Sequence, residues 1–239
     1  MSAKPLEVLI ACEESGTVRE AFRALGHNAW SCDLAPARVE TNFHIQADIR
    51  EVLKWGRHWD LLIAHPPCTY LCNSGVRWLT TPAKDPKVLT GEPRRLAMRE
   101  AGELFADLLT CEIPKIAIEN PVIHKYAKQA IKDALIAKGH HWSAADNLTT
   151  FAQSIQPWQF GHGEVKRTCL WLRGLDFLMP TEVVEGRAAV VHRASPGPTR
   201  ARDRSVTYQG IAAAMAMQWG GDARGAEWHE ANPVGMMEG

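Results

Sequence analysis

The sequence has no excess of charge of either sign, since 27 Lys and Arg residues balance 27 Asp and Glu residues among 239. Global charge therefore gives no argument for a nucleic-acid or membrane-surface partner, and any such partner must be inferred from a local patch. The chain also lacks an apolar stretch long enough to span a bilayer, and its first residues lack the apolar segment of a signal peptide. These absences predict a protein of the cytoplasm that has no membrane partner.

The sequence also does not favour disulfides, and it contains no internal repeat. Most of its six cysteines stand in apolar, strand-like runs, which suits a reducing compartment. They are Cys12, Cys32, Cys68, Cys72, Cys111 and Cys169. Because 46% of the residues are apolar, the chain can bury one sizeable core, and a single domain is the default expectation.

Short apolar runs alternate with amphipathic stretches along most of the chain. Strands are expected at 6–11, 27–32, 43–46, 61–64, 115–118, 142–155 and 168–172. Helices are expected at 17–25, 49–55, 93–108, 122–139 and 208–219. Residues 73–93 show no periodicity, which predicts a long mobile loop. The alternation predicts an α/β fold with a doubly wound, mostly parallel sheet and helices on both faces.

The stretch that leads to Cys68 is the most informative one. The run Leu61–Ala64 is too short for a helix and fits a strand buried on both faces. Pro66 and Pro67 cannot donate ladder hydrogen bonds, so strand pairing must stop before Cys68. Cys68 is thereby placed at the carboxyl end of a parallel strand, where open α/β sheets bind ligands. The alternative is a buried cysteine that serves only as a small apolar side chain.

Polar residues follow the other expected strands as well. They are Glu13 to Gly16, Asp33, Asp48 and the Glu119-Asn120 pair. Because a parallel sheet brings the carboxyl ends of its strands to one edge, we expect these residues to line one cleft. The Ser15-Gly16 turn allows close approach of a ligand, and Asp33 is placed to accept hydrogen bonds from a ribose diol. A nucleoside-containing cofactor fits this pattern, although each carboxylate taken singly could instead cap a loop.

The motifs also occur in a distinctive order. They are Glu14-Ser15-Gly16, Asp33, Asp48-Ile49, Pro66-Pro67-Cys68, Glu119-Asn120-Pro121, Lys166-Arg167-Thr168 and the segment Tyr208–Trp219. This order resembles the DNA cytosine-C5 methyltransferases over most of residues 6–220. The Gly-rich first motif of that family is replaced here by Cys12–Gly16. The resemblance implies a Rossmann-like fold that uses S-adenosyl-L-methionine, with a catalytic domain over 1–221 and a flexible tail over 222–239.

The chemistry implied by the resemblance requires a nucleophile. C5 of cytosine is too weak a nucleophile to take a methyl group directly, so the Cys68 thiolate first adds to C6. Glu119, with Asn120 beside it, assists at N3, and Arg167 or Lys166 places positive charge near O2. The resemblance assigns cofactor binding to Glu13, Glu14, Ser15, Gly16, Asp33, Leu34, Asp48, Ile49 and Pro66. Pro67 and Lys166 are expected at the substrate. The local basic charge of Arg94, Arg95, Arg200 and Arg202 makes them candidate nucleic-acid contacts, and no metal is expected.

The segment between Trp171 and the last helix sets the expected specificity. It holds only about 35 residues, too few for a target recognition domain, and in this the chain resembles compact members of the family from phage genomes. This implies relaxed or short sequence specificity in DNA, a protein partner that confers specificity, or a single-stranded or nucleotide substrate. A phage protein would act in the host cytoplasm. The basic segment 185–205 is a candidate phosphate contact, and a solvated loop is its alternative. Its arginines are Arg187, Arg193, Arg200, Arg202 and Arg204.

Three other interpretations compete with this one. An amino-methyltransferase needs an acid or amide before its double proline and an aromatic residue after it, where this chain has His65 and Cys68. A zinc site at His65, Cys68 and Cys72 would lack a second ligand pair at metal spacing. A catalytically idle nucleic-acid-binding or accessory protein need not keep both Cys68 and Glu119, and the chain keeps both.

Overall fold

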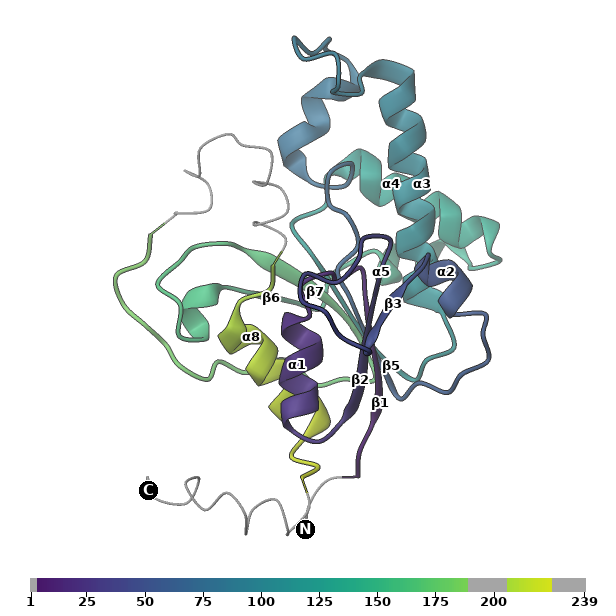
Figure 1. The fold of residues 1–239 in the computed structure, drawn as a ribbon. Helices are drawn as coiled ribbons and strands as arrows, with labels where there is room; N and C mark the ends of the chain where they lie inside the picture. Colours follow the sequence, from purple (N-terminus) through teal and green to yellow (C-terminus); the bar gives the residue numbers. More distant parts are fainter. Residues whose placement is uncertain (1–3, 189–205, 225–239) are drawn as a thin grey trace.

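A computed structural model describes residues 4–188 and 206–224 of the chain. A seven-stranded sheet with the order β3-β2-β1-β4-β5-β7-β6 forms its centre (Figure 1). The strands are β1 (Glu7–Ala11), β2 (Asn28–Asp33), β3 (His44–Gln46), β4 (Leu61–Ala64), β5 (Lys115–Asn120), β6 (Gln153–Ile155) and β7 (Thr168–Arg173). Strands β1 to β5 pair in parallel, whereas β7 is antiparallel to both β5 and β6. The predicted Rossmann-like α/β fold with a mostly parallel, doubly wound sheet is thus confirmed.

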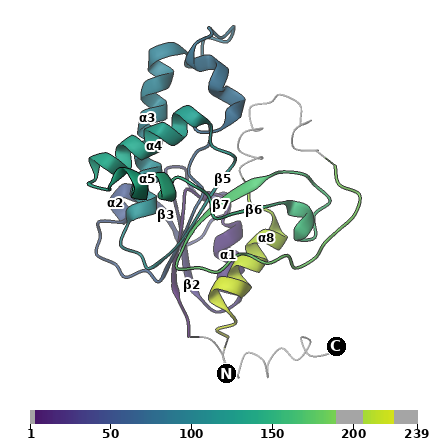
Figure 2. The same cartoon turned by 180° about the vertical axis from the view of Figure 1, so that it is seen from behind.

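Helices cover both faces of the sheet. Helices α1 (Thr17–Ala24) and α8 (Gln209–Met215) lie side by side on one face (Figure 2). The other face carries α2 (Ile49–Val52), α3 (Gly91–Thr110), α4 (Lys125–Ala137) and α5 (Trp142–Leu148). Figure 1 shows that the start of α3 extends beyond the carboxyl edge of the sheet. That edge is therefore flanked by helical structure on one side.

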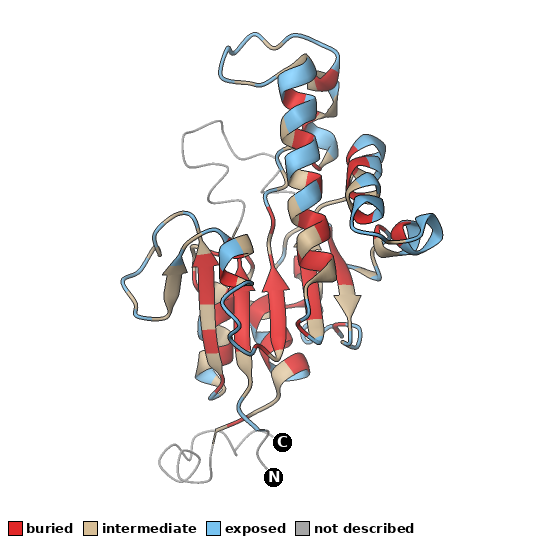
Figure 3. Cartoon of the chain, turned by 90° about the vertical axis from the view of Figure 1, so that its right-hand side faces the viewer, coloured by how far each residue is buried: buried red, intermediate tan, exposed pale blue. Residues whose placement is uncertain are grey.

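Strands β1 and β4 form the buried centre of the sheet (Figure 3). All four residues Leu61–Ala64 are inaccessible to solvent. Leu61 and Ile63 pack with α1 and α8, whereas Leu62 and Ala64 pack on the face of α3 and α4. Because successive side chains of a strand point to opposite faces, burial on both sides requires an unbroken apolar run. The sequence pattern at this strand therefore has a direct physical cause.

Residues 73–93 are more ordered than the sequence predicts. Asn73–Leu79 form a 3₁₀ helix, η1, and α3 already begins at Gly91. Leu79 is buried, and its carbonyl oxygen accepts a hydrogen bond of 3.0 Å from the Arg95 side chain on α3. Only 80–90 lack regular structure. The 3₁₀ helix escapes sequence analysis because it buries only Gly75 and Leu79 and so leaves no periodic apolar pattern.

The expected strand at 142–155 divides into helix α5 and the short strand β6. His141 caps the start of the helix, because its side chain accepts a hydrogen bond from the Ser143 backbone. Ala144 and Ala145 favour helix, and Ala145 is the one helix residue that is fully buried. Local capping thus outweighs the β propensity of the flanking Trp142 and Phe151.

Residues after α8 continue to contact the domain. A π-helical turn, η3 (Ala216–Gly220), leads to Gly221, whose carbonyl oxygen lies 2.8 Å from Nε2 of His27. The backbone N–H of Ala223 donates to the Leu25 carbonyl at 2.8 Å. The tail expected from 222 is therefore packed as far as Arg224, and its remainder lies outside the described residues. Within 4–188 and 206–224, no helix combines the length and apolarity needed to cross a bilayer.

Candidate active site

The Pro-Pro turn after β4 places Cys68 at the carboxyl edge of the sheet. The backbone N–H of His65 still donates to Ala11 on β1 at 2.9 Å, and the ladder ends at the prolines. Nδ2 of buried Asn120, the last residue of β5, donates to the Pro66 carbonyl at 2.8 Å. This bond fastens the turn to the neighbouring strand. Cys68 itself is half-buried, so its sulfur is held by the scaffold but is not sealed in the core.

Glu119 lies beside this turn in a polar cluster at the end of β5. Its Oε2 atom is 2.8 Å from Nδ1 of His65, and it also accepts a hydrogen bond of 3.3 Å from Thr207, just before α8. The side chains of His65 and Glu119 are only 11% and 14% exposed. Lys166, before β7, acts electrostatically on His65, Cys68 and Glu119 alike. The structure thus brings Cys68, Glu119 and Lys166 together from three strands.

Contact between Glu119 and His65 fixes their charges. Burial alone would raise the pKa of Glu119 and lower that of His65, because it disfavours both ions. The hydrogen bond and opposite charge of His65 outweigh burial and, with Lys166 and Thr207, lower the pKa of Glu119 to about 2. Glu119 in turn, with a contribution from Glu13, raises the pKa of His65 above 6.5. The contact therefore favours a carboxylate and imidazolium pair over a neutral pair.

Cys72 forms a thiol pair with Cys68. The Cys72 backbone N–H donates to the Cys68 carbonyl at 3.0 Å, so the two residues span one helical turn, and their side chains are in hydrogen-bond contact. The Cys72 sulfur also lies 3.1 Å from Oγ of Ser74. The hydrogen bond from Cys68, followed by that from Ser74, lowers the pKa of Cys72 to about 5. The same contact, together with burial, raises the pKa of Cys68, so the proton between the two sulfurs is held preferentially on Cys68.

Alkylation measures where that proton lies. In the free protein at about pH 7, iodoacetamide is expected to modify Cys72 at least about ten times faster than Cys68, because only the thiolate reacts. Ser74→Ala removes one hydrogen bond to the Cys72 thiolate and is expected to slow its modification. Peptide mass spectrometry gives each rate, with half-buried Cys111 as an internal slow thiol whose pKa is raised by burial. Equal rates at Cys68 and Cys72 would contradict the shared-proton description.

Asp33 ends β2 and Asp48 follows β3, at the neighbouring part of the same edge. Burial is the largest cause that raises the pKa of the Cys12 thiol after β1, and the charges of Asp33 and Asp48 add to it. Cys12 has a positive φ of 58°, a strained conformation for a residue with a side chain and one that concentrates at functional sites. Leu34, next to Asp33, is 72% exposed. An exposed apolar side chain between carboxylates suits the flat face of a nucleobase.

The turn that follows β1 is held by internal contacts. Glu13 caps α1: its carboxylate accepts hydrogen bonds from the backbone of Val18 at 2.7 Å and of Arg19 at 3.3 Å. Ser15 Oγ donates to Glu13 at 3.2 Å. Glu14 forms an ion pair of 2.7 Å with Arg38. The predicted cofactor residues of this turn therefore lie at the expected edge, and their carboxylates shape the turn itself.

The remaining predicted cofactor residues separate into buried and exposed groups. Asp48 is exposed and caps α2, since its Oδ1 accepts a hydrogen bond of 2.9 Å from the Arg50 backbone. Ile49 and Pro66 are buried, so they support the edge from below. Gly16 has a φ of 75°, a left-handed conformation that favours glycine, and a Cβ atom there would displace the Arg19 guanidinium.

The predicted basic residues occupy different places. Lys166 faces the cluster and lies 5.5 Å from the Tyr208 ring centroid. Arg167 points to the other face of the sheet, where its guanidinium lies 5.7 Å from the Phe151 ring centroid and contacts the Cys169 thiol. Arg94 is buried and donates to the Thr69 carbonyl at 2.9 Å, and it therefore supports the Cys68 to Cys72 turn. Arg95 bonds to Leu79, as described above.

Part of the basic segment 185–205 falls outside the described residues. Arg193, Arg200, Arg202 and Arg204 are among these. Arg187 is described, and its guanidinium stacks 3.6 Å from the Trp158 ring centroid. Pro67 is exposed beside Cys68 and is therefore accessible to a substrate.

Two residues of the cluster were missed from the sequence. Thr207 carries no motif that marks it, and it reaches Glu119 only because α8 docks against α1. His65 was considered only as a zinc ligand or as an argument against amino-methyl transfer. Its position directly before the Pro-Pro turn was the available signal. Among the described residues, no group of three or more His, Cys, Asp or Glu side chains is arranged to hold a metal ion.

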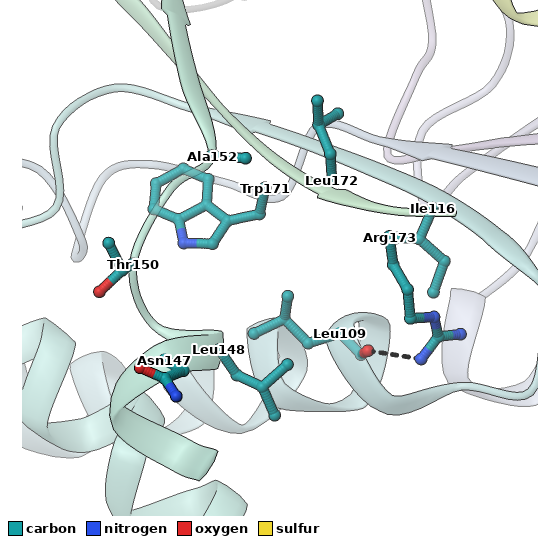
Figure 4. Close-up of a pocket in the computed structure, with 9 residues that line it drawn as sticks. All are labelled: Leu109, Ile116, Asn147, Leu148, Thr150, Ala152, Trp171, Leu172 and Arg173. Atoms are coloured by element: carbon teal, nitrogen blue, oxygen red, sulfur yellow. Dashed lines mark hydrogen bonds between the residues drawn. The ribbon is translucent and has the colours of Figure 1, made fainter. Parts of the chain in front are cut away.

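A cavity of about 200 Å³ lies at the opposite edge of the sheet (Figure 4). Leu109 at the end of α3, Ile116 at the start of β5 and Arg173 at the end of β7 line it. Trp171 and Leu148 also contribute to its wall. None of the clustered residues at the carboxyl edge lines this cavity, so it is separate from the candidate active site.

Comparisons with known proteins give likenesses of structure. Neither a protein-family profile nor a curated protein sequence matches the chain. One similar structure is described as a DNA modification methyltransferase encoded within a prophage of E. coli; it has 12% identity and a TM-score of 0.45, over 75% of this chain and 52% of that one. An Entamoeba histolytica methyltransferase has 14% identity and a TM-score of 0.38, over 81% and 61%. A Spodoptera frugiperda DNMT2 variant has 16% identity and a TM-score of 0.36, over 77% and 55%. The chain spans little more than half the length of these proteins.

Proposed function

We propose that this protein transfers a methyl group from S-adenosyl-L-methionine to C5 of cytosine in DNA. The observation that carries the proposal is the meeting of Cys68, Glu119 and Lys166 at one edge of the sheet. They come from positions far apart in the sequence, and their chemistry is complementary. A sulfur nucleophile, a hydrogen-bonding carboxylate and a cation are the groups that activation of cytosine requires.

The reaction begins with addition of Cys68 to the base. The sulfur bonds to C6 as its proton passes to the Cys72 thiolate, and the π electrons move through C5 and C4 to N3, which takes a proton. The activated C5 atom would then take the electrophilic methyl group that bound S-adenosyl-L-methionine would supply, with S-adenosylhomocysteine as the by-product. Loss of the C5 proton, return of the N3 proton and departure of the Cys68 sulfur restore aromaticity and the enzyme. Lys166 stabilises the charge that develops on the ring.

The ends of β1, β2 and β3 beside this site would hold the cofactor. Asp33 would accept hydrogen bonds from the ribose diol, Asp48 would accept one from the adenine amino group, and Leu34 would pack on the adenine ring. The exposure of Leu34 and the strained backbone of Cys12 support this placement. When bound, S-adenosyl-L-methionine supplies an electrophilic methyl group. The residues of this chain hold and orient it.

Asp33→Asn tests the cofactor assignment. The substitution removes a charge-assisted hydrogen bond to the ribose and is expected to raise the KM for S-adenosyl-L-methionine by about tenfold or more, with a smaller change in kcat. Isothermal titration with S-adenosylhomocysteine should show the same loss of affinity. Glu40→Gln neutralises an exposed carboxylate of the nearby loop and serves as the control. Equal cofactor affinity in Asp33→Asn and the wild-type protein would place the ribose elsewhere.

The proposed substrate class follows from the short segment between β7 and α8. Only 35 residues separate the end of β7 at Arg173 from the start of α8 at Gln209. We therefore infer relaxed or short sequence specificity, unless a partner protein confers it. Cytosine in single strands or in free nucleotides is the second candidate substrate, because a segment of this length is too short for a separate domain that recognises duplex DNA.

A transfer assay tests the proposed function. The protein is incubated with labelled S-adenosyl-L-methionine and duplex DNA, single-stranded DNA, RNA or dCTP, and the digested products are separated by mass spectrometry. The expected product is 5-methylcytosine from one or more DNA substrates. N4-methylcytosine would overturn the proposal in favour of amino-methyl transfer. Cofactor binding without any methylated product would favour the idle accessory protein.

A further inference from the structure

The two oxygens of Glu119 have different surroundings. Oε2 accepts both hydrogen bonds, from His65 at 2.8 Å and from Thr207 at 3.3 Å. Oε1 receives no hydrogen bond from any residue of the described ranges. It is also not one of the solvent-inaccessible polar atoms that lack a hydrogen-bond partner. Among the described residues, the carboxylate is therefore held through Oε2 alone. Oε1 is the oxygen that can face a ligand.

The charge of Glu119 conflicts with the step assigned to it. Addition of Cys68 to C6 generates a basic N3 atom that must take a proton, but an ionised carboxylate has none to give. The nearest group that carries one is the His65 imidazolium, whose Nδ1 faces the same carboxylate. We propose that His65 is the proton reservoir of the site and that its proton reaches N3 of cytosine through Glu119. This inference rests on the proposed function and adds a positioning residue to it.

His65 and Glu119 together gain and lose no net proton in this scheme. As Cys68 adds to C6, the Nδ1 proton of His65 moves to Glu119, and a half-turn of the carboxyl group presents it to N3. His65 is then neutral and Glu119 is again a carboxylate. When Cys68 departs, the N3 proton returns by the same route. The proton lost from C5 is released separately, so the pair neither gains nor loses a proton over the cycle.

The surroundings of His65 keep it charged. Glu119 on β5 and Glu13 after β1 favour the imidazolium, whereas Lys166 before β7 and burial oppose it. Nε2 of His65 is buried and has no hydrogen-bond partner within the described part of the chain. Among these residues that atom is without a partner in either form, so it does not explain the charge, which depends on the attraction of the two carboxylates. The proton that faces Glu119 is the one on Nδ1.

His65→Asn tests the role of the proton. The Asn amide keeps an N–H donor near the position of Nδ1 but cannot release a proton. In the wild-type protein, kcat/KM should fall as the pH rises through the raised pKa of His65. In the variant, Glu119 must carry the proton itself, so the fall should begin at least about one pH unit lower. At about pH 8 the variant should lose about a hundredfold in kcat/KM, and the loss should be smaller at about pH 6.

Two controls separate this role from a structural one. Thr207→Val removes the other hydrogen bond to Oε2 without removing a titrating group, so its pH profile should keep the wild-type shape. NMR titration of the histidine ring carbons in the free protein should show one resonance with a pKa above 6.5, absent in His65→Asn. A uniform loss of rate at every pH, or a His65 pKa at or below its ordinary value, would overturn the inference. Failure of the wild-type protein to methylate any cytosine would overturn the proposed function. The NMR titration would still measure the pKa of His65 in that case.

Discussion

Cys68→Ser is expected to lower kcat for methyl transfer at least about a thousandfold. Serine has nearly the same shape, so the Pro-Pro turn and the Asn120 bond to it should persist. Its hydroxyl has a far higher pKa than a thiol and is a much weaker nucleophile toward C6, and Cys72 is too weak a base to ionise it. Addition to the base, on which every later step depends, would then fail. Labelled methyl transfer at saturating cofactor gives the rate.

The covalent intermediate provides an independent measurement for this variant. DNA that carries 5-fluorocytosine cannot lose its C5 substituent as a proton, so the wild-type protein should accumulate an adduct with the DNA. Cys68→Ser should form none, whereas Cys72→Ser should still form it. Thermal unfolding should show that Cys68→Ser keeps the wild-type stability to within about 1 kcal/mol. Methyl transfer at the wild-type rate by Cys68→Ser would refute thiolate addition and favour an amino-methyltransferase.

The position of Cys68 was predictable because local rules determine it. Leu61–Ala64 had to be a buried strand, and two prolines had to end its pairing, whatever the rest of the chain did. The choice between Lys166 and Arg167 also had a local signal that we did not use. Along β7, the side chains of Cys169 and Trp171 lie on the α3 and α4 face of the sheet, and that of Leu170 lies on the α1 and α8 face. Because side chains alternate along a strand, Arg167 is expected on the same face as Cys169 and Trp171, and Lys166 on the other face, where Glu119 lies.

The contacts that make Glu119 reactive were not predictable in the same way. His65 and Glu119 are 54 residues apart, and Thr207 is 88 residues from Glu119. Their meeting depends on strand order and on the docking of α8, which no local pattern encodes. Helix α5 was missed for a related reason: a cap made by one histidine decides its structure against the propensity of its neighbours. The sequence therefore identified the groups at the edge, and only the structure showed which of them share protons.

Glu119→Gln is expected to lower both activity and stability, the latter in a manner that depends on pH. The amide can donate to N3 but cannot pass on a proton, so kcat should fall by about a hundredfold to ten-thousandfold. In the wild-type protein, the raised pKa of His65 gives stability that is complete below 6.5 and is lost as the pH rises through the raised value. The lowered pKa of Glu119 gives stability that is present above 4.5 and is lost as the pH falls towards about 2.

In the variant, the sign of the histidine contribution reverses. Without the carboxylate, burial dominates and lowers the pKa of His65, so the variant loses stability as the pH falls below the ordinary imidazole value. The difference in Tm between the two proteins should therefore widen from about pH 8 to about pH 5.5. Breaking a buried pair costs on the order of 3 kcal/mol, which corresponds to roughly 6 to 12 °C for a domain of this size. Scanning calorimetry across this range measures the difference. A gap in Tm that stays constant with pH would show that His65 and Glu119 do not form a charged pair in the folded protein.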